Sequence, residues 1–293
     1  RGVNSWLSAR KEGHGEASDG PRYHRRGSTR GHPGIVDPGA VLAVAEGVGM
    51  NITIEVPPCY SLLSGGKDSW ACAKYLQEHD LLLGCVALNT GINVPAWLPT
   101  LQAMCAKEGW PLEVYQTDVV YEDLVRKYGF PGLSKHAWMV SYLKGRGVAK
   151  FKKAHPKTPM ASGVRVAESD RRTLNTLPIS KWEGVTIYAP ILNWSTAETW
   201  AYVKARGYER PDSYSKLGIS GDCLCGSYAQ PWERQAVATH YPEVDARLKV
   251  LENDPIVCAF KRRATWGWSK SRQRAKKGLE ALVCAECGDT EHV

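Results

Sequence analysis

The chain has no apolar run that approaches the roughly 20 residues required by a membrane-spanning helix. It also lacks the basic and apolar opening of a secretion signal, and it contains no internal repeat. These absences predict a globular, cytoplasmic protein with no membrane partner. At 293 residues, 43% of them hydrophobic, the chain is long enough to bury a sizeable core.

Disulfides are not expected, because no secretion signal directs the chain to an oxidising compartment. The nine cysteines are therefore predicted to be free thiols or ligands of a metal or cluster. The formal net charge of +8 favours an anionic partner such as a nucleotide, a sulfonucleotide or a nucleic acid.

The stretch YSLLSGGKDSWACAKYL, residues 60–76, has the pattern of a strand, a glycine-rich loop and a helix. Helical spacing begins at Trp70, and Asp68 or Ser69 is the predicted cap. Glycines bring backbone amides close to a bound ion, and the first turn of a helix adds unpaired N–H donors. Lys67 adds a positive charge, so the loop is predicted to hold a phosphate. It is not a Walker P-loop, which needs four residues between its glycines.

Predicted strands and helices alternate along most of the chain. Strands are expected at 51–56, 81–88, 112–115, 159–166 and 185–190, and helices after Asp37 and at 96–107, 121–128 and 196–206. This alternation predicts an α/β fold, with a parallel twisted sheet and helices on both faces. Ligands of such sheets bind beyond the carboxyl ends of the strands. The loops at 64–69, 89–91 and 163–165 are therefore expected to converge on one crevice.

SGGKDS resembles the pyrophosphate-binding signature of the PP-loop ATP pyrophosphatase superfamily. Four later segments, ALNTGINVP, YGFPGLSKHAWMVSYLK, ASGVRVAESDRR and APILNWSTAETWAYV, resemble in order and spacing the phosphoadenylylsulfate (PAPS) reductase-like branch of that superfamily. The resemblance implies an adenine nucleotide alpha hydrolase-like fold and a nucleotide substrate. Reductases of the branch usually carry a weakened glycine loop, so the complete loop here favours intact ATP, with Mg²⁺, as the substrate.

The resemblance also implies which residues bind the nucleotide. The candidates are Ser64, Gly65, Gly66, Lys67, Asp68, Ser69, Asn89, Lys144, Gly163, Arg165 and Arg171. Lys67, Asp68 and Arg165 are the candidates for a catalytic role. The residues themselves agree with this for Arg165, because a guanidinium that follows a glycine at a strand end is suited to phosphate oxygens. Arg171 and Arg172 have an equally good alternative as residues that open a helix.

Four cysteines form two pairs, Cys223 with Cys225 and Cys284 with Cys287. Their spacing alone suits tetrahedral zinc as well as an iron–sulfur cube, and four unliganded thiols are the alternative. The resemblance implies a [4Fe-4S] cluster, with Cys258 as a candidate to replace one ligand. Cys287 also lies in a string similar to the one that carries the nucleophilic thiol of the reductases. The remaining cysteines, Cys59, Cys72, Cys85 and Cys105, are expected in the core.

The first functional hypothesis is an ATP pyrophosphatase that adenylates an acceptor in sulfur transfer, of the nucleic-acid thiolation or phosphorothioation type. A run of cations and aromatics over 260–277 is suited to nucleic acid, with a charged helix lying over the cysteine loop as the alternative. A sulfur-donor protein is a further candidate partner. The second hypothesis is a PAPS or adenylylsulfate reductase that forms sulfite, and the third is a non-catalytic nucleotide-binding module.

Three regions are expected along the chain. Residues 1–36 are polar and rich in glycine and arginine, which predicts a flexible basic arm. Residues 37–210 would form the PP-loop domain, and residues 211–293 a C-terminal region with the cysteines and a basic helix. The glycine-rich loop 218–226 is expected to be anchored by the cysteine site and to close over the nucleotide.

Overall fold

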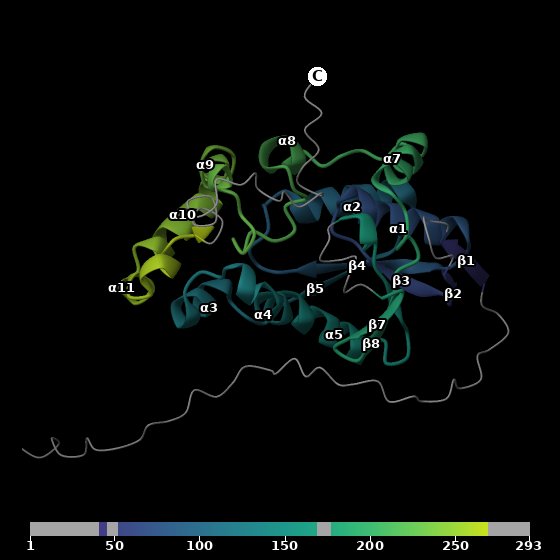
Figure 1. Cartoon of the computed structure of the whole chain (residues 1–293), viewed down its shortest axis with the longest axis horizontal. Coiled ribbons are helices and arrows are strands. Elements are labelled where there is room, and N and C mark those ends of the chain that lie inside the picture. The colour runs from purple at the N-terminus through teal and green to yellow at the C-terminus, as the bar shows by residue number, and fades with distance from the viewer. Residues whose placement is uncertain (1–40, 46–51, 169–176, 269–293) are drawn as a thin grey trace, which may run out of the picture. The chain divides into compact units, whose positions relative to one another are not determined.

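The computed structural model describes residues 41–45, 52–168 and 177–268, which belong to one compact unit that begins at Asp37. The described residues form a six-stranded sheet, a two-stranded sheet and the helices around them (Figure 1). The two-stranded sheet pairs β1 (Val41–Ala45) with β2 (Ile52–Val56) in antiparallel register. The prediction of a helix after Asp37 is therefore wrong. The apolar run VLAVA pairs its backbone with a strand instead, which satisfies its hydrogen-bonding groups without a helical turn.

The six-stranded sheet has the order β5-β4-β3-β6-β8-β7. Its strands are β3 (Cys59–Leu62), β4 (Leu82–Asn89), β5 (Leu112–Gln116), β6 (Met160–Ala161), β7 (Ile179–Trp182) and β8 (Val185–Tyr188). All neighbouring pairs are parallel except β7 with β8, so the predicted parallel sheet is confirmed, with one antiparallel edge strand that the sequence did not reveal. The strand predicted at 159–166 is only two residues long.

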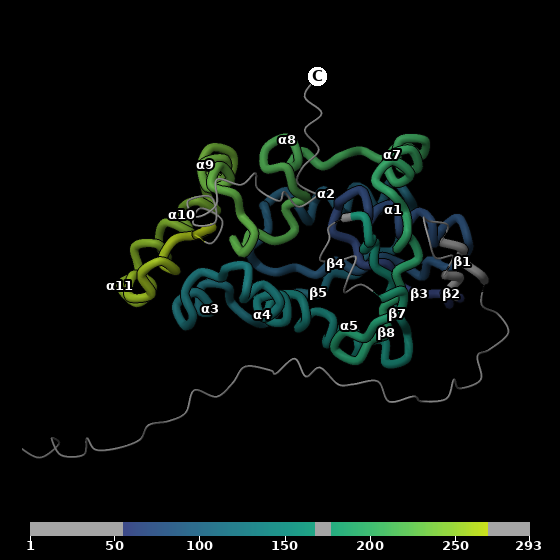
Figure 2. The backbone as a smooth tube through the Cα atoms, viewed as in Figure 1, coloured from purple at the N-terminus to yellow at the C-terminus, as the bar shows by residue number. Residues whose placement is uncertain are grey.

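The chain changes direction across the sheet between β3 and β6. It runs from β3 outward through β4 to β5, and then returns to place β6 on the other side of β3. The loops that follow β3 and β6 therefore flank a topological switch point, where open α/β sheets bind their ligands. Figure 2 shows this return as one continuous tube through α5.

Helices cover both faces of the sheet, as the sequence predicted. The N-terminal part of the unit contributes α1 (Lys67–Glu78), α2 (Trp97–Glu108), α3 (Tyr121–Tyr128), α4 (His136–Val140), the π-helix η2 (Ser141–Gly145), α5 (Arg146–Ala154) and α7 (Thr196–Ala205). Along β4, Cys85 and Ala87 face one apolar cluster, whereas Val86 and Leu88 face a second cluster that contains Phe151 of α5. This alternation with a period of two means that both faces of β4 are buried.

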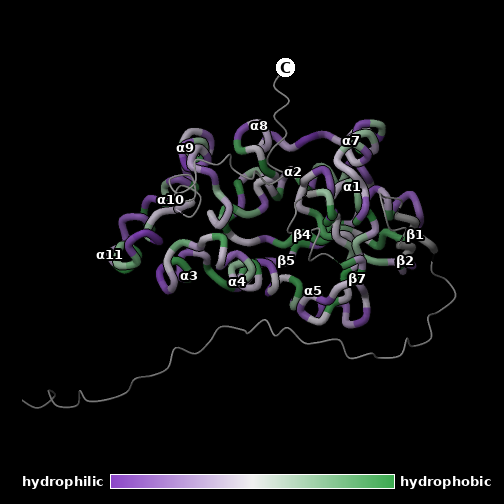
Figure 3. The backbone as a smooth tube through the Cα atoms, in the orientation of Figure 1, coloured by the Kyte–Doolittle hydropathy of each residue, from purple (hydrophilic) through white to green (hydrophobic). Residues whose placement is uncertain are grey.

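The remaining helices pack beside α3. They are α8 (Ser213–Leu217), α9 (Pro231–His240), α10 (Pro242–Glu252), α11 (Pro255–Cys258) and the short 3-10 helix η4 (Lys261–Ala264). Arg247 of α10 binds Glu122 of α3, and Arg234 of α9 pairs with Glu252 at 2.9 Å. Outer turns of α9 and α10 are hydrophilic in Figure 3, whereas hydrophobic residues concentrate near the sheet. In the described part of the chain, every helix is too short or too polar to cross a membrane.

Candidate active site

The loop Ser64–Ser69 joins β3 to α1 in a tight turn that begins with two glycines after Ser64. Gly65 adopts a φ of +93°, which an L side chain rarely adopts, and Gly66 is the extended residue that precedes the helix. The helix begins at Lys67, so the prediction of Asp68 or Ser69 as the cap is wrong. Those two residues lie in the first turn instead, where the backbone N–H groups have no partner within the helix. Backbone N–H groups therefore lie both in the turn itself and in the first turn of α1.

Protein donors bind the carbonyl groups of this loop. Trp97 Nε1 donates to the Ser64 carbonyl at 2.8 Å, and the Tyr208 hydroxyl donates to the Gly65 carbonyl at 2.9 Å. Ser69 Oγ donates to the Gly66 carbonyl at 2.8 Å. With the carbonyls bound, the negative ends of the peptide dipoles are directed into the protein. Within the described residues the Gly65 N–H has no acceptor, whereas the Gly66 N–H donates to Ser64 Oγ at 3.4 Å.

The two serine hydroxyls hold the loop together. Ser64 Oγ and Ser69 Oγ lie 3.1 Å apart, and the Ser64 N–H donates to Ser69 Oγ at 3.2 Å. The sequence placed both residues among the phosphate-binding groups. Their contacts also close the two ends of the loop on each other.

Asp68 joins this loop to the one that follows β6. Arg165 Nε donates to Asp68 Oδ1 at 2.6 Å, and Lys67 Nζ lies 3.4 Å from Asp68 Oδ2. The side chains of Lys67 and Asp68 are each 7% exposed, and that of Arg165 is 1% exposed. Arg165 also donates to the Trp194 carbonyl at 3.0 Å. The guanidinium is therefore occupied by the protein, and Asp68 balances one of two buried positive charges.

Gly163 allows the two loops to touch. A Cβ atom at this position would lie 2.2 Å from the Asp68 carbonyl oxygen and 2.8 Å from the Ser69 nitrogen. No side chain fits in that space. The sequence identified Gly163 as a binding residue, and the structure places it directly against the backbone of the glycine loop.

Another set of residues near the loop was not identified by the sequence analysis. The Trp200 ring lies 5.4 Å from Lys67 Nζ, and Arg210 lies over both Trp200 and Tyr214, at 5.7 and 4.6 Å from the ring centres. A Cβ on Gly66 would lie 2.7 Å from the Tyr214 hydroxyl. The feature of the sequence that could have identified these residues is the group of aromatic residues around Trp194 and Ser195. Lys67 and Arg210 thus both lie over the Trp200 ring.

The loop after β4 forms a third side and binds the glycine-rich segment near Cys223. Asn89 Oδ1 accepts a hydrogen bond from the Gly91 N–H at 3.0 Å, which shapes the turn. The Val94 N–H then donates to the Gly221 carbonyl at 2.9 Å, and the Leu224 N–H donates to the Ile92 carbonyl at 2.7 Å. These backbone bonds anchor the segment 221–224 beside the loop that follows β4.

Lys144 reaches the same segment from the π-helix η2. Its Nζ forms an ion pair with Asp222, whose other oxygen lies 3.1 Å from Ser220 Oγ. Burial alone would lower the pKa of Lys144, but the Asp222 carboxylate and the thiols of Cys223 and Cys225 raise it overall. The predicted nucleotide ligand Lys144 is therefore a cation already paired with the segment that contains the thiols.

Cys223 and Cys225 form a thiol pair on that segment. The hydrogen bond between them has the largest influence on both: it raises the pKa of Cys223 and lowers the pKa of Cys225. Burial opposes the second shift, and contacts with His136 and Ser227 reinforce it, with Ser227 Oγ 3.4 Å from Cys225 Sγ. Only Leu224 separates the two residues along this segment. Two cysteines with this spacing suit one edge of a zinc site or an iron–sulfur cluster.

The described residues supply only part of the predicted metal site. Arg171, Cys284 and Cys287 lie outside the residues that the structure describes. Among the residues it does describe, no group of three or more His, Cys, Asp or Glu side chains is placed to hold a metal ion. Cys258 is exposed, with Sγ 3.3 Å from the Glu252 carbonyl. The four cysteines predicted for the core, Cys59, Cys72, Cys85 and Cys105, are buried, which confirms that prediction.

The glycine loop, the parallel sheet and its switch point define an α/β protein of the PP-loop, nucleotide-binding class. Residues 58–216 match the sequence model of the phosphoadenosine phosphosulfate reductase domain, and the chain belongs to that family. An uncharacterized 37.8 kDa protein of Escherichia phage 186 is 30% identical over 136 residues, which cover 43% of this chain and 39% of that protein. The chain thus matches about two fifths of the length of this relative.

Similar solved structures belong to several enzymes. Phosphoadenylylsulfate reductase from Candida auris is 17% identical, with a TM-score of 0.42 over 54% of this chain and 77% of that one. FMN adenylyltransferase from Candida glabrata, in complex with FAD and inorganic pyrophosphate, is 15% identical, with a TM-score of 0.41 over 55% and 53%. The U34-tRNA thiolase NcsA from Methanococcus maripaludis, with its [4Fe-4S] cluster, is 14% identical, with a TM-score of 0.41 over 80% and 76%.

The contact at Gly163 predicts that Gly163→Ala weakens nucleotide binding by about 100-fold, because the added methyl displaces the loop by the ångström or so that such sites do not tolerate. Calorimetric titration with ATP and with phosphoadenylylsulfate measures the loss. Ser162→Ala is the matched control, since it changes the preceding residue without adding volume, and it should bind as the wild type does. Equal affinity in Gly163→Ala and the wild type would contradict the placement of the two loops.

Proposed function

We propose that the protein binds ATP at the glycine loop and transfers its adenylyl group to an acceptor, releasing pyrophosphate, as one step of sulfur transfer. The single observation that supports this best is the loop itself, whose carbonyls are bound by Trp97, Tyr208 and Ser69. Amides fixed in this way stabilise negative charge without reorganising during the reaction. The β-phosphate and the departing pyrophosphate carry such charge.

The residues of the loop take separate roles in this proposal. The amides of Gly65, Gly66 and the first turn of α1 hold the pyrophosphate portion of ATP. Lys67 neutralises the charge that develops on the leaving group. Asp68 and Arg165 are positioning residues, because each is buried and bonded to the other. Mg²⁺ would arrive with the nucleotide, bound mainly by phosphate oxygens and water.

The chemical step is a displacement at the α-phosphorus. An oxygen of the acceptor forms a bond to the α-phosphorus, and the bond from that phosphorus to the bridging oxygen breaks. Pyrophosphate leaves with the bonding electron pair, and the proton of the acceptor passes to solvent. The adenylated acceptor is then activated for replacement of its oxygen by sulfur, supplied by a sulfur-donor partner.

The thiol pair would serve the later sulfur step. Cys223 and Cys225 would hold one side of a [4Fe-4S] cluster, and Cys284 and Cys287 would complete it. When bound by four thiolates, such a cluster would supply a route for electrons, because each of its irons would already have a protein ligand. Zinc on the same ligands is the alternative, and it would make the site structural.

Family membership favours a second candidate, a phosphoadenylylsulfate or adenylylsulfate reductase. That reaction needs a thiol that attacks the sulfur of the sulfonucleotide and displaces the adenosine nucleotide. A second thiol then attacks the thiol sulfur of the S-sulfo intermediate, which forms a disulfide and releases sulfite. Cys287 is the candidate nucleophile. It cannot easily serve in the same step as a cluster ligand, so the two proposals assign it different roles.

Lys67→Ala should lower pyrophosphate release from ATP by roughly 100- to 1,000-fold, because the mutation removes a buried charge that faces the leaving group. The measurement is pyrophosphate formation with Mg²⁺ and a mixture of DNA, RNA and small-molecule acceptors. Lys74→Ala is the matched control, since Lys74 lies on the same helix and binds Glu108 at 2.9 Å, away from the loop. Its activity should remain that of the wild type.

The same assay separates the alternatives. Sulfite production from a sulfonucleotide with thioredoxin, and no pyrophosphate from ATP, would establish the reductase instead. Tight ATP binding with neither product, across all acceptors, would identify a nucleotide-binding module without turnover.

Cys225→Ser should lower the iron and sulfide bound after anaerobic purification well below the wild-type content, because it removes one of the four proposed thiolate ligands. Cys258→Ser is the matched control and should retain both, since that thiol is exposed and bonded to the Glu252 carbonyl. One zinc per chain and no sulfide in the wild type would replace the cluster with a structural zinc site. If the wild type contains neither iron nor zinc, the four cysteines are thiols without a metal.

A further inference from the structure

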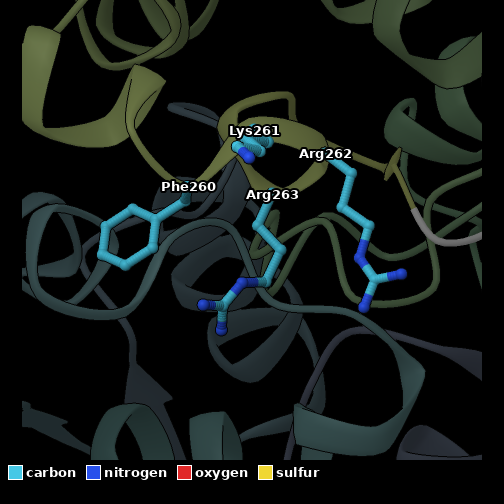
Figure 4. Close-up of a pocket in the computed structure, with 4 residues that line it drawn as sticks. All are labelled: Phe260, Lys261, Arg262 and Arg263. Carbon is cyan, nitrogen blue, oxygen red and sulfur yellow. The ribbon is translucent and has the colours of Figure 1, made fainter.

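A basic pocket lies outside the glycine loop, at the turn that follows α11. It has a volume of about 650 Å³ and is lined by Phe260, Lys261, Arg262 and Arg263 (Figure 4). Lys261 and Arg262 are exposed, and Arg263 is half-buried. Figure 4 shows Arg262 and Arg263 extending from the turn in different directions, with Phe260 on the far side of Arg263. The turn around the pocket thus carries three neighbouring positive charges, and the pocket wall itself is formed mainly by carbon atoms of these four side chains.

These three cations differ from the other arginines nearby in having no acidic partner. Arg126 is paired with Asp254 at 3.0 Å, and Arg247 is paired with Glu122. Among the residues that the structure describes, no carboxylate lies within salt-bridge distance of Lys261, Arg262 or Arg263. Three adjacent unpaired charges repel one another, and an anion in the pocket would remove that repulsion.

Aromatic rings accompany the cations. The Arg262 guanidinium lies 5.5 Å from the centre of the Trp268 ring, and that of Arg263 lies 5.0 Å from the Phe260 ring. On the adjoining end of α3, Lys127 lies 5.2 Å from the Tyr128 ring. Cations that neutralise phosphates and rings that stack bases are the combination that binds single-stranded nucleic acid. A pocket for a small inorganic anion would not need the rings.

The backbone that carries the pocket is fixed to the rest of the protein. Lys261 has a φ of +54°, and the Phe130 N–H donates to the Arg263 carbonyl at 2.8 Å. Trp268 Nε1 donates to the Phe130 carbonyl at 2.9 Å. Gly129 has no room for a side chain, since its Cβ would lie 2.9 Å from Arg263 Cβ. The cations therefore project from a built turn.

The turn is also joined to the thiol pair. Trp266 Nε1 donates to the Leu224 carbonyl at 2.8 Å, between Cys223 and Cys225. A Cβ on Gly226 would lie 2.6 Å from that same nitrogen, so Trp266 packs directly on the thiol segment. One tryptophan thus connects the basic turn to the segment that carries both thiols.

We propose that this pocket binds the sugar-phosphate backbone of a single-stranded nucleic acid and holds that strand beside the thiol segment. The proposal rests on the proposed function in one respect: the bound strand would be the acceptor in that reaction. Binding itself requires neither ATP nor turnover. Arg262 and Arg263 contact phosphates, and the Phe260 ring beside Arg263 offers a face for a base.

The test is fluorescence anisotropy with labelled 20-nucleotide single-stranded RNA and DNA, without ATP, over a series of salt concentrations. Arg262→Ala/Arg263→Ala should raise Kd at low salt roughly tenfold and flatten the slope of log K against log salt by about 1.4, at 0.7 for each lost phosphate contact. Both substitutions retain Cβ and the backbone bond to Phe130. Melting temperature checks that the variant is folded. Arg262→Lys/Arg263→Lys should restore most of the salt slope.

Lys153→Ala/Lys157→Ala is the matched control. It removes two exposed positive charges at the end of α5, which Figure 1 places away from α11. An equal loss of affinity in this control would show a response to net charge alone and would overturn the proposal. So would wild-type affinity in the folded arginine variant, or binding of an acidic protein but of no nucleic acid. Because ATP is absent, loss of pyrophosphate release in the earlier assay leaves this result unaffected.

Discussion

The pairing of Asp68 with Lys67 and Arg165 is the interaction on which the proposed nucleotide site depends. All three charges are buried, with side chains between 1% and 7% exposed. A buried charge is costly unless it is paired, and removal of one partner leaves another unpaired at a cost of about 3–5 kcal/mol. Asp68 belongs to the loop after β3, and Arg165 to the loop after β6. The pair therefore fixes the two loops on either side of the switch point.

Other contacts extend this arrangement toward the C-terminal helices. The loop after β4 binds the segment 221–224 through backbone hydrogen bonds, and Lys144 pairs with Asp222 in the same segment. Trp266 then joins that segment to the basic turn. The glycine loop, the thiol pair and the basic pocket therefore lie within one compact unit, joined by specific contacts. The proposed reaction, with ATP, a sulfur donor and a polymeric acceptor, would use sites linked in this way.

Local patterns predicted the elements well. Helix α3 has the predicted bounds, because Gly129 ends it and its apolar residues recur at helical spacing. Strand β4 begins and ends within one residue of its prediction, since a run of apolar residues marks a strand buried on both faces. The β1 prediction failed for a related reason. An apolar run of that length suits either structure, and the pairing with β2 decided it.

Contacts between residues that are far apart in the chain could not be predicted from the sequence. The motif revealed Arg165, but only the fold shows that its guanidinium is occupied by Asp68 and Trp194. Trp200 and Arg210 lie more than a hundred residues after the glycine loop, and no local pattern places them beside Lys67. The same holds for the pairing of Lys144 with Asp222. Each of these contacts depends on the order of strands in the sheet, which local spacing does not encode.

The most direct test of this account is a double-mutant cycle on ATP affinity with Asp68→Asn, Arg165→Met and the double variant. If the pair fixes the loop, each single variant should weaken binding at least about tenfold, and the double variant should be little worse than either. The coupling energy would then be about 1.5 kcal/mol or more. Additive effects of the two substitutions, or ATP affinity unchanged in either folded single variant, would contradict the claim that this buried pair holds the nucleotide site in place.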